Sequence, residues 1–153
     1  MERITRYIGF VIAIAVINVM ASCGGDNATD PATEAANKLS GTWAINGGYV
    51  KADGADVTSD YTGLAITFTE TKSNVPVYAV QNGGYAFNNI TFDTWNFTDN
   101  TFTAIERGQD EIVMHYTITD DALTLNFTVP DPLLEGGRAQ GIFGDFEIKL
   151  KKK

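Results

Sequence analysis

The sequence predicts an all-β domain, built as an eight-stranded antiparallel up-and-down barrel. Beyond Leu39, apolar and polar residues alternate with a period of about two, which is typical of strands that bury one face. Short turns rich in Gly, Asp and Asn separate the alternating stretches, as in a meander. Eight such strands leave two unpaired edges, which closure into a barrel would remove. The expected strands are residues 39–46, 64–69, 75–80, 91–98, 101–107, 111–119, 122–129 and 142–151.

The N-terminal residues predict an export signal that precedes this domain. Arg3 and Arg6 are followed by an apolar run over residues 7–19 and by the small residues Ala21 and Ser22, which is the order of a secretory signal peptide. A membrane-spanning helix needs about 20 apolar residues, and this run ends earlier. We therefore expect three parts, which are a signal peptide over residues 1–22, a lipidated flexible tether over residues 23–38 and the β domain over residues 39–153.

The single cysteine of the chain, Cys23, directly follows the predicted signal. An exported protein with one cysteine has no intramolecular disulfide, so the thiol is expected to have another role. The sequence Met20-Ala21-Ser22-Cys23 resembles the lipobox of bacterial lipoproteins, which implies that the thiol carries a diacylglycerol and becomes the new N-terminus. Each buried methylene contributes about 0.8 kcal/mol, so several acyl chains would anchor the domain to a membrane. A plain signal peptide with an incidental cysteine is the alternative.

The segment after Cys23 predicts a flexible tether and a location. Residues 24–38 are rich in Gly, Asp, Asn, Ala, Thr and Pro and have no apolar period, a composition that buries too little surface to order itself. Gly24 stands where an aspartate retains many enteric lipoproteins in the inner membrane. By resemblance to that sorting rule, we expect the protein at the bacterial outer membrane, on its periplasmic or its surface face.

The charge of the chain argues against one class of partner. Its formal net charge is −8, whereas a nucleic-acid partner requires clustered Lys and Arg for the phosphates. No nucleic acid is therefore expected as a partner. Lysines gather at the C-terminus, where they are interpreted as a solvated end that keeps the last strand from pairing with other chains, with contact to lipid head groups as the alternative. These lysines are Lys149, Lys151, Lys152 and Lys153.

One hairpin can be assigned residue by residue. With Asp120 and Asp121 in the turn, alternate side chains of the two flanking strands fall on a common apolar face. A slip by one residue would bury threonines and expose aromatic rings, so the pattern determines the register. The pairs expected on the buried face are Ile118 with Leu123, Tyr116 with Leu125, Met114 with Phe127 and Ile112 with Val129.

A second hairpin is expected around the turn residues 99–100. The same parity rule places Phe97 opposite Phe102 and Trp95 opposite Ala104. The aromatic pair would contribute about 0.2 to 1 kcal/mol to the stability of the sheet.

Several short motifs carry a family resemblance. The stretch Leu39-Ser40-Gly41-Thr42-Trp43 resembles the Gly-x-Trp signature in the first strand of lipocalins. Residues 116–125 and 146–150 look like the closing hairpin and last strand of small lipocalin-like lipoproteins of Gram-negative bacteria, and residues 53–58 with 64–68 look similar to an uncharacterised branch of that group. The resemblance implies a lipocalin-like barrel in which Trp43 plugs the closed end and does not contact a ligand.

Little in the sequence predicts catalysis. His115 is the only histidine and is expected on the outward face opposite Asn126, whereas nucleophilic catalysis needs a histidine beside a nucleophile. A lone histidine without a free cysteine leaves zinc only carboxylate ligands. Asp53, Asp56 and Asp60 share a loop, but their spacing does not fit an EF-hand, so they are interpreted as solvated acids. We expect no enzyme, no metal and no cofactor, although a carboxylate pair for glycoside hydrolysis stays open at this level.

Two hypotheses for the function remain open. In the first, the barrel holds one small apolar ligand in an interior cavity. In the second, the barrel is filled by its own side chains and works through its outer face or its end loops, as an interaction or accessory subunit of an envelope complex. The residues expected to line the cavity are Phe68, Met114, Tyr116, Leu125 and Phe127.

Overall fold

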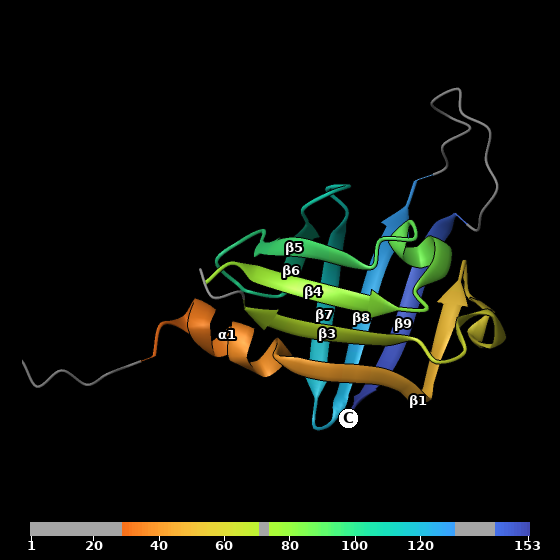
Figure 1. Ribbon diagram of the computed structural model, residues 1–153, viewed down its shortest axis with the longest axis horizontal. Helices are drawn as coiled ribbons and strands as arrows, with labels where there is room; N and C mark the ends of the chain where they lie inside the picture. The colour runs from red at the N-terminus through yellow and green to blue at the C-terminus, as the bar shows by residue number, and fades with distance from the viewer. Residues whose placement is uncertain (1–28, 71–73, 131–142) are drawn as a thin grey trace, which may run out of the picture.

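The computed structural model describes residues 29–70, 74–130 and 143–153, and Figure 1 shows them as a barrel of strands with one helix at an end. The expected signal peptide and Cys23 lie outside the described residues. Helix α1 spans Pro31–Leu39, and the 3-10 helices η1 and η2 span Thr58–Tyr61 and Gly84–Phe87. The strands are β1 (Gly41–Ala52), β2 (Ala55–Asp56), β3 (Ala65–Glu70), β4 (Pro76–Gln81), β5 (Phe92–Phe97), β6 (Ala104–Arg107), β7 (Val113–Thr119), β8 (Ala122–Val129) and β9 (Gly144–Lys152).

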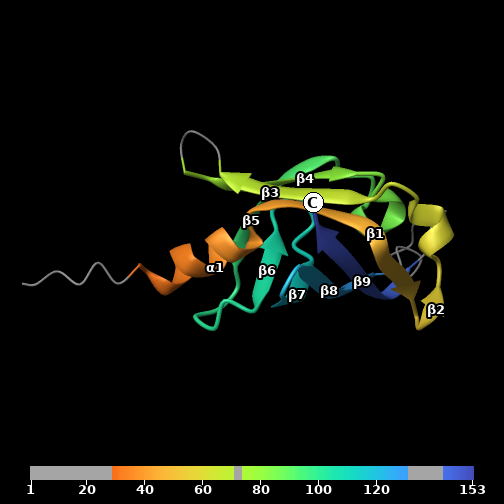
Figure 2. The ribbon, with the colours of Figure 1, turned by 90° about the horizontal axis from the view of Figure 1, so that it is seen from below.

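Eight of these strands form a closed antiparallel barrel, which confirms the expected all-β, lipocalin-like fold class. The order around the barrel is β1, β3, β4, β5, β6, β7, β8 and β9, and β9 pairs back with β1. Strand β2 is an addition of two residues that pairs with the end of β1. Each stretch expected from the alternation corresponds to one barrel strand. In Figure 2, β3 and β4 lie on one side of the barrel and β7, β8 and β9 on the other.

Strand β1 closes the barrel because it bends and pairs on both sides. Its first half pairs with β3 and both halves pair with β9, with a change of register between Ala44 and Tyr49. Gly48 lies in this bend, where a Cβ atom would come within 1.8 Å of the carbonyl oxygen of Lys149. Only glycine allows the two backbones to approach so closely. The alternation predicts that the strand ends before the Gly-Gly pair, whereas β1 continues through the bulge to Ala52.

The register expected for the hairpin of β7 and β8 is confirmed where the two strands pair. The turn contains Asp120, whose φ angle of 52° lies in the left-handed region that a tight turn requires. The residues of both strands therefore keep the parity that separates the apolar face from the polar one. The observed pairs are His115 with Asn126, Tyr116 with Leu125, Thr117 with Thr124, Ile118 with Leu123 and Thr119 with Ala122.

The register expected for the second hairpin is wrong, because Phe97 and Trp95 do not pair with Phe102 and Ala104. The shift changes which residues of β6 face inward, and it turns the charged side chain of Arg107 into the barrel. The observed pairs of β5 and β6 are Trp95 with Arg107, Asn96 with Glu106 and Phe97 with Ile105.

Asp99 explains this shift. Its Oδ1 atom accepts hydrogen bonds from the backbone N–H groups of Thr101 at 2.9 Å and Phe102 at 3.1 Å. Such local bonds from a carboxylate compete with the ladder of a tight hairpin, so residues 98–103 form a loop and β6 begins late. The rings of Phe97 and Phe102 still meet edge to face, with centroids 5.1 Å apart.

Helix α1 occupies part of the segment expected to be a flexible tether, so that expectation is wrong for the helical residues. Asp30 caps the helix by accepting a hydrogen bond from the N–H group of Thr33 at 3.3 Å, and Pro31 suits the first helical position. Leu39 anchors the other end, because its side chain is fully buried against the barrel. The composition of the segment did not indicate a helix, because a helix this short is stable only through a tertiary contact such as that of Leu39. No described helix is long and apolar enough to cross a membrane.

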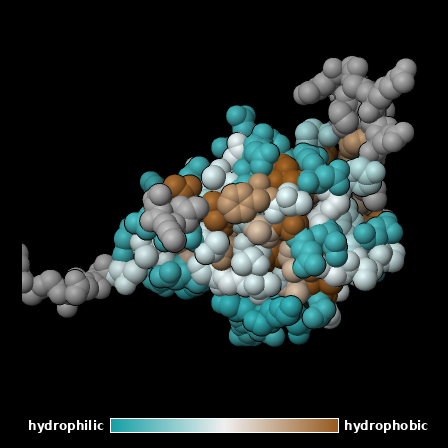
Figure 3. All heavy atoms as spheres, viewed as in Figure 1, coloured by the Kyte–Doolittle hydropathy of each residue, from teal (hydrophilic) through white to brown (hydrophobic). Residues whose placement is uncertain are grey.

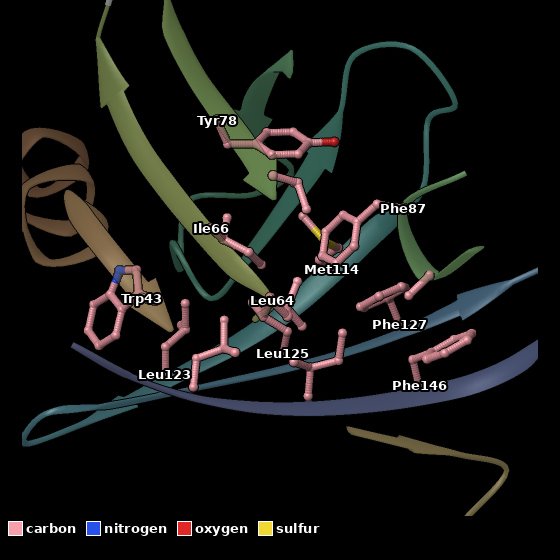
Figure 4. Packing of buried hydrophobic residues seen from close by; sticks show 14 of the residues in the cluster. Trp43, Leu64, Ile66, Tyr78, Phe87, Met114, Leu123, Leu125, Phe127 and Phe146 are labelled. Atoms are coloured by element: carbon pink, nitrogen blue, oxygen red, sulfur yellow. The ribbon is translucent and has the colours of Figure 1, made fainter. Parts of the chain in front are cut away.

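The inward side chains of the barrel strands form one hydrophobic core, part of which Figure 4 shows. Each barrel strand contributes large buried side chains, so the interior is filled from every side. Examples, one from each strand in chain order, are Trp43, Ile66, Tyr78, Trp95, Ile105, Met114, Leu123 and Ile148.

The bend in β1 gives a test of how the barrel closes. Gly48→Ala should lower the free energy of unfolding by about 2 to 3 kcal/mol, because the added methyl group collides with backbone that cannot move away easily. The matched control is Gly54→Ala, since a Cβ atom there meets no atom within 4 Å although φ is +79°. Urea unfolding of the two variants measures the difference. Equal stability of both variants would contradict the role of close packing at Gly48.

Candidate functional site

Four of the five residues expected to line a cavity are buried members of the hydrophobic core. The exposed fractions are 2% for Phe68, 0% for Met114 and Leu125, and 5% for Phe127. Tyr116 is half-buried and packs against the same core. The structure thus brings the first four together inside the barrel and leaves Tyr116 at its margin.

Aromatic rings occupy much of the interior. The ring of Phe68 meets that of Trp95 edge to face, with centroids 6.1 Å apart. The ring of Phe127 stacks on Phe146 at 5.6 Å and lies 5.7 Å from Phe87. Figure 4 shows Phe87, Met114 and Phe127 converging on one region of the core. The side chains expected to contact a ligand therefore contact one another or other core residues.

Trp43 lies at the end of the barrel where α1 joins β1. Its side chain is 1% exposed, and its Nε1–H group donates a hydrogen bond to the carbonyl oxygen of Leu39 at 2.7 Å. The Nζ atom of Lys152 lies 5.1 Å from the centroid of the indole ring, within the range of a cation–π contact. These contacts hold the ring at this end of the barrel, and its role as a plug stays an expectation from the lipocalin resemblance.

A buried arginine lies toward the opposite end of the barrel. Arg107 is fully buried, and its guanidinium lies 5.4 Å from the ring of Phe87 and 5.6 Å from the ring of Phe127. Its Nη1 atom donates to the carbonyl oxygen of Ala86 at 2.9 Å. Its Nε atom donates to Oδ1 of Asp110 at 2.8 Å, and Nη2 donates to Oδ2 of the same carboxylate. The charge is therefore both paired and hydrogen-bonded, as a buried charge must be.

Asp110 and Arg107 link the η2 segment to the turn between β6 and β7. Burial raises the pKa of the Asp110 carboxyl, but the hydrogen bonds and the positive charge of Arg107 outweigh burial and hold the pKa below its usual value. Asn88, which directly follows η2, donates from Nδ2 to Oδ2 of Asp110 at 2.8 Å. The η2 segment and the β6–β7 turn are thus held to each other at this end of the barrel.

A second buried acid reinforces the same region. Asp93 is 4% exposed and accepts hydrogen bonds from the N–H groups of Thr94 at 2.7 Å and Gln109 at 3.0 Å. The hydroxyl group of Tyr78 lies 3.4 Å from Oδ2 of Asp93. Burial, the largest influence, raises the pKa of Tyr78 far above its usual value, so this phenol stays protonated. The polar groups here connect β4, β5 and the β6–β7 turn.

Sequence reasoning missed Arg107 and Asp110 because the wrong register in β6 turned the arginine outward. A usable signal was present, since the strand Ala104–Arg107 ends on a charged residue and an acid follows three positions later. An arginine and an aspartate at that spacing can form the two-bond contact observed here. Burial of the pair could not be read from the spacing, because Phe87 and Phe127 come from other parts of the chain.

His115 lines a shallow groove on the outside of the barrel, together with Asn126 and Glu147. Its exposed position opposite Asn126 confirms the orientation expected from the sequence. Asn126 pairs in turn with Glu147, and Glu147 with Lys51, so a row of polar residues crosses β7, β8, β9 and β1. The hydroxyl group of Tyr49 donates to Glu147 and holds the pKa of that carboxyl below its usual value. Mixed charges of this kind suit surface contacts more than the capture of an apolar ligand.

A second groove lies between α1 and β7. Tyr116, the one expected cavity residue outside the closed interior, lies here with its hydroxyl group donating to the carbonyl oxygen of Phe102. The groove is open to solvent along the helix, so it is a surface feature and not the interior of the barrel. The residues that line it are Pro31, Glu34, Ala35, Lys38, Thr101, Phe102, Thr103, Tyr116, Thr117 and Ile118.

Two of the three loop acids considered for calcium accept hydrogen bonds from backbone N–H groups, and Asp60 accepts one from the hydroxyl group of Ser59 at 3.4 Å. Oδ1 of Asp53 accepts the N–H group of Asp145 at 2.8 Å, and Oδ1 of Asp56 accepts the N–H group of Thr58 at 2.9 Å. The hydrogen bonds from Thr58 hold the pKa of Asp56 below its usual value. Within the described ranges, no group of three or more His, Cys, Asp or Glu residues is placed to hold a metal ion.

Comparisons with known proteins add no relative to this picture. No protein-family model, no curated protein and no solved structure matches the chain. The candidate functional features therefore rest on the residues and the geometry of this chain alone.

The Arg107–Asp110 pair can be tested by a double-mutant cycle. Asp110→Ala should lower the free energy of unfolding by about 3 kcal/mol, because it leaves a buried guanidinium without its carboxylate. Adding Arg107→Met should restore part of that loss, since an unbranched apolar side chain needs no partner. Urea unfolding of Asp110→Ala, of Arg107→Met and of the double variant measures both changes.

The control for this cycle is Glu34→Ala, which removes an ion pair to Lys38 whose two side chains are more than half exposed. A much smaller change is expected there because solvent screens the charges. A double variant less stable than Asp110→Ala alone would contradict the interpretation of Arg107 as a charge that depends on its partner.

Proposed function

We propose that the protein is a membrane-anchored lipoprotein whose filled barrel acts as an interaction or accessory subunit of an envelope complex. The observation that carries the proposal is the burial of Phe68, Met114, Leu125 and Phe127 in a common core. A barrel that binds a ligand inside needs side chains that line an empty volume. Here the same side chains pack against protein, so recognition is assigned to the outer surface and the loops.

The two ends of the barrel support this assignment. Trp43 packs at the end next to α1, and the opposite end holds Arg107 with Phe87 from the η2 segment. A ligand entering at the second end would have to displace both an aromatic ring and a paired charge. Removing one partner of a buried ion pair typically costs about 3 to 5 kcal/mol, so entry there is strongly disfavoured.

The anchor in this proposal is Cys23, for which the lipobox-like residues before it are the support. The tether is shorter than the composition indicates, because α1 begins at Pro31. A chain extends by at most about 3.6 Å per residue, so the barrel would stay within a few nanometres of the bilayer. The proposed location remains the bacterial outer membrane, and the proposal includes no catalytic residue and no nucleic-acid partner.

A small apolar ligand is the second candidate, now placed outside the barrel. The groove beside α1 favours it, because Phe102, Tyr116 and Ile118 offer apolar surface there. A ligand in this groove would contact Tyr116, the one expected cavity residue that is only half-buried.

The filled interior predicts that the protein takes up no lipophilic probe. Recombinant mature chain carrying Cys23→Ser should appear as bare protein in native mass spectrometry and should leave the fluorescence of an apolar dye unchanged. The side chains that would line a cavity for the dye are buried in one hydrophobic core. The control is Phe87→Ala, which should create a cavity and allow uptake. If the parent protein takes up the dye and the Tyr116→Lys variant does so equally, the dye lies in the interior of the barrel. That outcome would contradict the filled barrel.

The anchor has a separate test. Cys23→Ser should move the protein from the membrane fraction to the soluble fraction of the producing bacterium, because the acyl chains supply the membrane affinity. Mass spectrometry of the parent protein should show the added diacylglycerol on Cys23. Retention of Cys23→Ser in the membrane fraction would refute the lipoprotein assignment. Thr29→Ser, which keeps Cys23 and the lipobox-like residues before it, provides a matched control.

A further inference from the structure

The hairpin of β7 and β8 separates before its two strands end. Pairing stops at His115 and Asn126, whereas β7 begins at Val113 and β8 continues to Val129. The next pair along the ladder would be Val113 with Thr128, and it is absent from the described pairing. We call this gap between the start of β7 and the end of β8 the seam. It is a local opening in a barrel that is closed overall.

The backbone groups of Val113 and Thr128 face the seam. In an antiparallel ladder, alternate residues turn their N–H and C=O groups to opposite neighbours. Tyr116 donates its N–H group to the carbonyl oxygen of Thr103 at 2.9 Å, toward β6, so the odd-numbered residues of β7 turn these groups toward β8. Thr128 lies two residues beyond Asn126, the last residue of β8 that pairs with β7, and so has the same orientation. Hydrogen-bonding groups of both strands therefore point into the seam.

Local bonds hold the seam open from both sides. The N–H group of Ile112 donates to Oδ1 of Asp110 at 3.3 Å, and the carbonyl oxygen of Ile112 accepts the N–H group of Arg107 at 3.1 Å. These two bonds hold the start of β7 against the end of β6. On the other side, the hydroxyl group of Thr128 donates to Oδ1 of Asp145 at 2.6 Å, which ties the end of β8 to β9. The opening is therefore built into the fold.

A groove follows the seam on the outside of the barrel. Its volume is about 600 Å³, within the range of ligand sites in proteins. Val113, Phe127 and Thr128 line it from the two strands, and the acids Asp110 and Glu111 line it from the β6–β7 turn. Val113 is 36% exposed there. The groove thus combines strand backbone, some apolar surface and acidic side chains.

Glu111 gives the groove its charge. The carboxylate of Asp110 is matched by the guanidinium of Arg107, whereas Glu111 is exposed and forms no ion pair within the described part of the chain. No described lysine or arginine lines the groove, and the whole chain carries a net charge of −8. The electrostatic potential at the seam therefore favours a basic partner.

The opposite side of the barrel offers no comparable feature in β3 and β4. Figure 3 shows that brown and tan residues over β3, β4 and β5 lie among white and teal ones, a mixture that is normal for a protein surface. Strands β3 and β4 pair along their whole length. Scattered apolar side chains need no partner, whereas unpaired strand backbone invites one. Backbone complementarity, and not apolar area, therefore distinguishes the seam.

We infer that the seam binds an extended, basic peptide segment of a partner protein, which pairs with β7 and β8 as an added strand. The backbone groups of Val113 and Thr128 hold this segment, because a polypeptide in extended conformation presents N–H and C=O groups at the spacing of a ladder. A lysine or arginine of the segment reaches Glu111. The inference rests on the proposed function, in which the outer surface makes the contacts, and it names the surface and the class of partner.

A synthetic peptide of alternating residues, acetyl-Val-Lys-Val-Lys-Val-Lys-amide, tests the inference. Calorimetric titration into the full mature chain with Cys23→Ser should give a dissociation constant of about 10 to 100 µM, because the seam is short. The control peptide has the same sequence with methyl groups on the backbone nitrogens of its valines. It keeps the charge but cannot form the ladder, so it should bind at least about tenfold more weakly.

A charge reversal tests the acidic side of the groove. Glu111→Lys should weaken the binding of the peptide at least about threefold, because it turns attraction of the lysines into repulsion. The matched control is Asp121→Lys, which makes the same reversal at the turn at the other end of the hairpin, where the side chain is 66% exposed. It should leave the dissociation constant unchanged. Urea unfolding curves of both variants establish that the folded barrel is retained.

Hydrogen exchange of single amides locates the contact. In the free protein, the N–H groups of Val113 and Thr128 should exchange fast, whereas that of Asn126, which lies in the ladder, should exchange slowly. Saturation with the peptide should slow exchange at Val113 and Thr128 at least about tenfold, because both groups then donate to the added strand.

Three results would overturn the inference. They are absence of binding up to about 1 mM, equal binding of the methylated peptide, and slow exchange at Val113 and Thr128 that rises with protein concentration without any peptide. The last result would assign the seam to a second copy of the chain. Failure of the inference leaves the filled barrel intact, because uptake of an apolar dye tests the interior separately. Dye uptake with unchanged peptide binding would refute the filled barrel and keep the seam as a peptide site.

Discussion

Every barrel strand has two neighbours only because β1 bends far enough to pair with β3 on one side and β9 on the other. The bend depends on Gly48, where the backbones of β1 and β9 approach too closely for any side chain. Closure removes the strand edges that would otherwise pair with other chains. It also separates an inner surface, which must be apolar, from an outer one that is free to vary. The interior packing and the surface chemistry both follow from this separation.

The interior is closed by different chemistry at its two ends. At the α1 end, Trp43 presents an apolar ring whose N–H group is satisfied by a carbonyl oxygen. At the other end, Arg107 brings a charge into the core, and Asp110 and the carbonyl oxygen of Ala86 satisfy it. Such a network is stable only when complete, because a partly satisfied buried charge is costly. When the network is complete, it holds the η2 segment over this end of the barrel.

The exterior divides into surfaces of unlike character. Around His115, β8 presents Asn126 and threonines, and β9 presents two acids followed by two lysines. Across β3, β4 and β5 the outward side chains are uncharged, and Phe92 projects from them. A chain with a net charge of −8 would easily place acids on that face too.

The sequence alone determined the fold class and the number of barrel strands, because alternation with a period of two depends only on which side of a strand is buried. It also determined the register of the β7–β8 hairpin, where a slip would expose the aromatic rings of Tyr116 and Phe127. Only the tertiary structure decided the register of β6, the helix ending at Leu39 and the burial of Arg107. Each of these depends on contacts with distant residues or on a local bond such as that of Asp99, which outweigh the pattern of the strand itself.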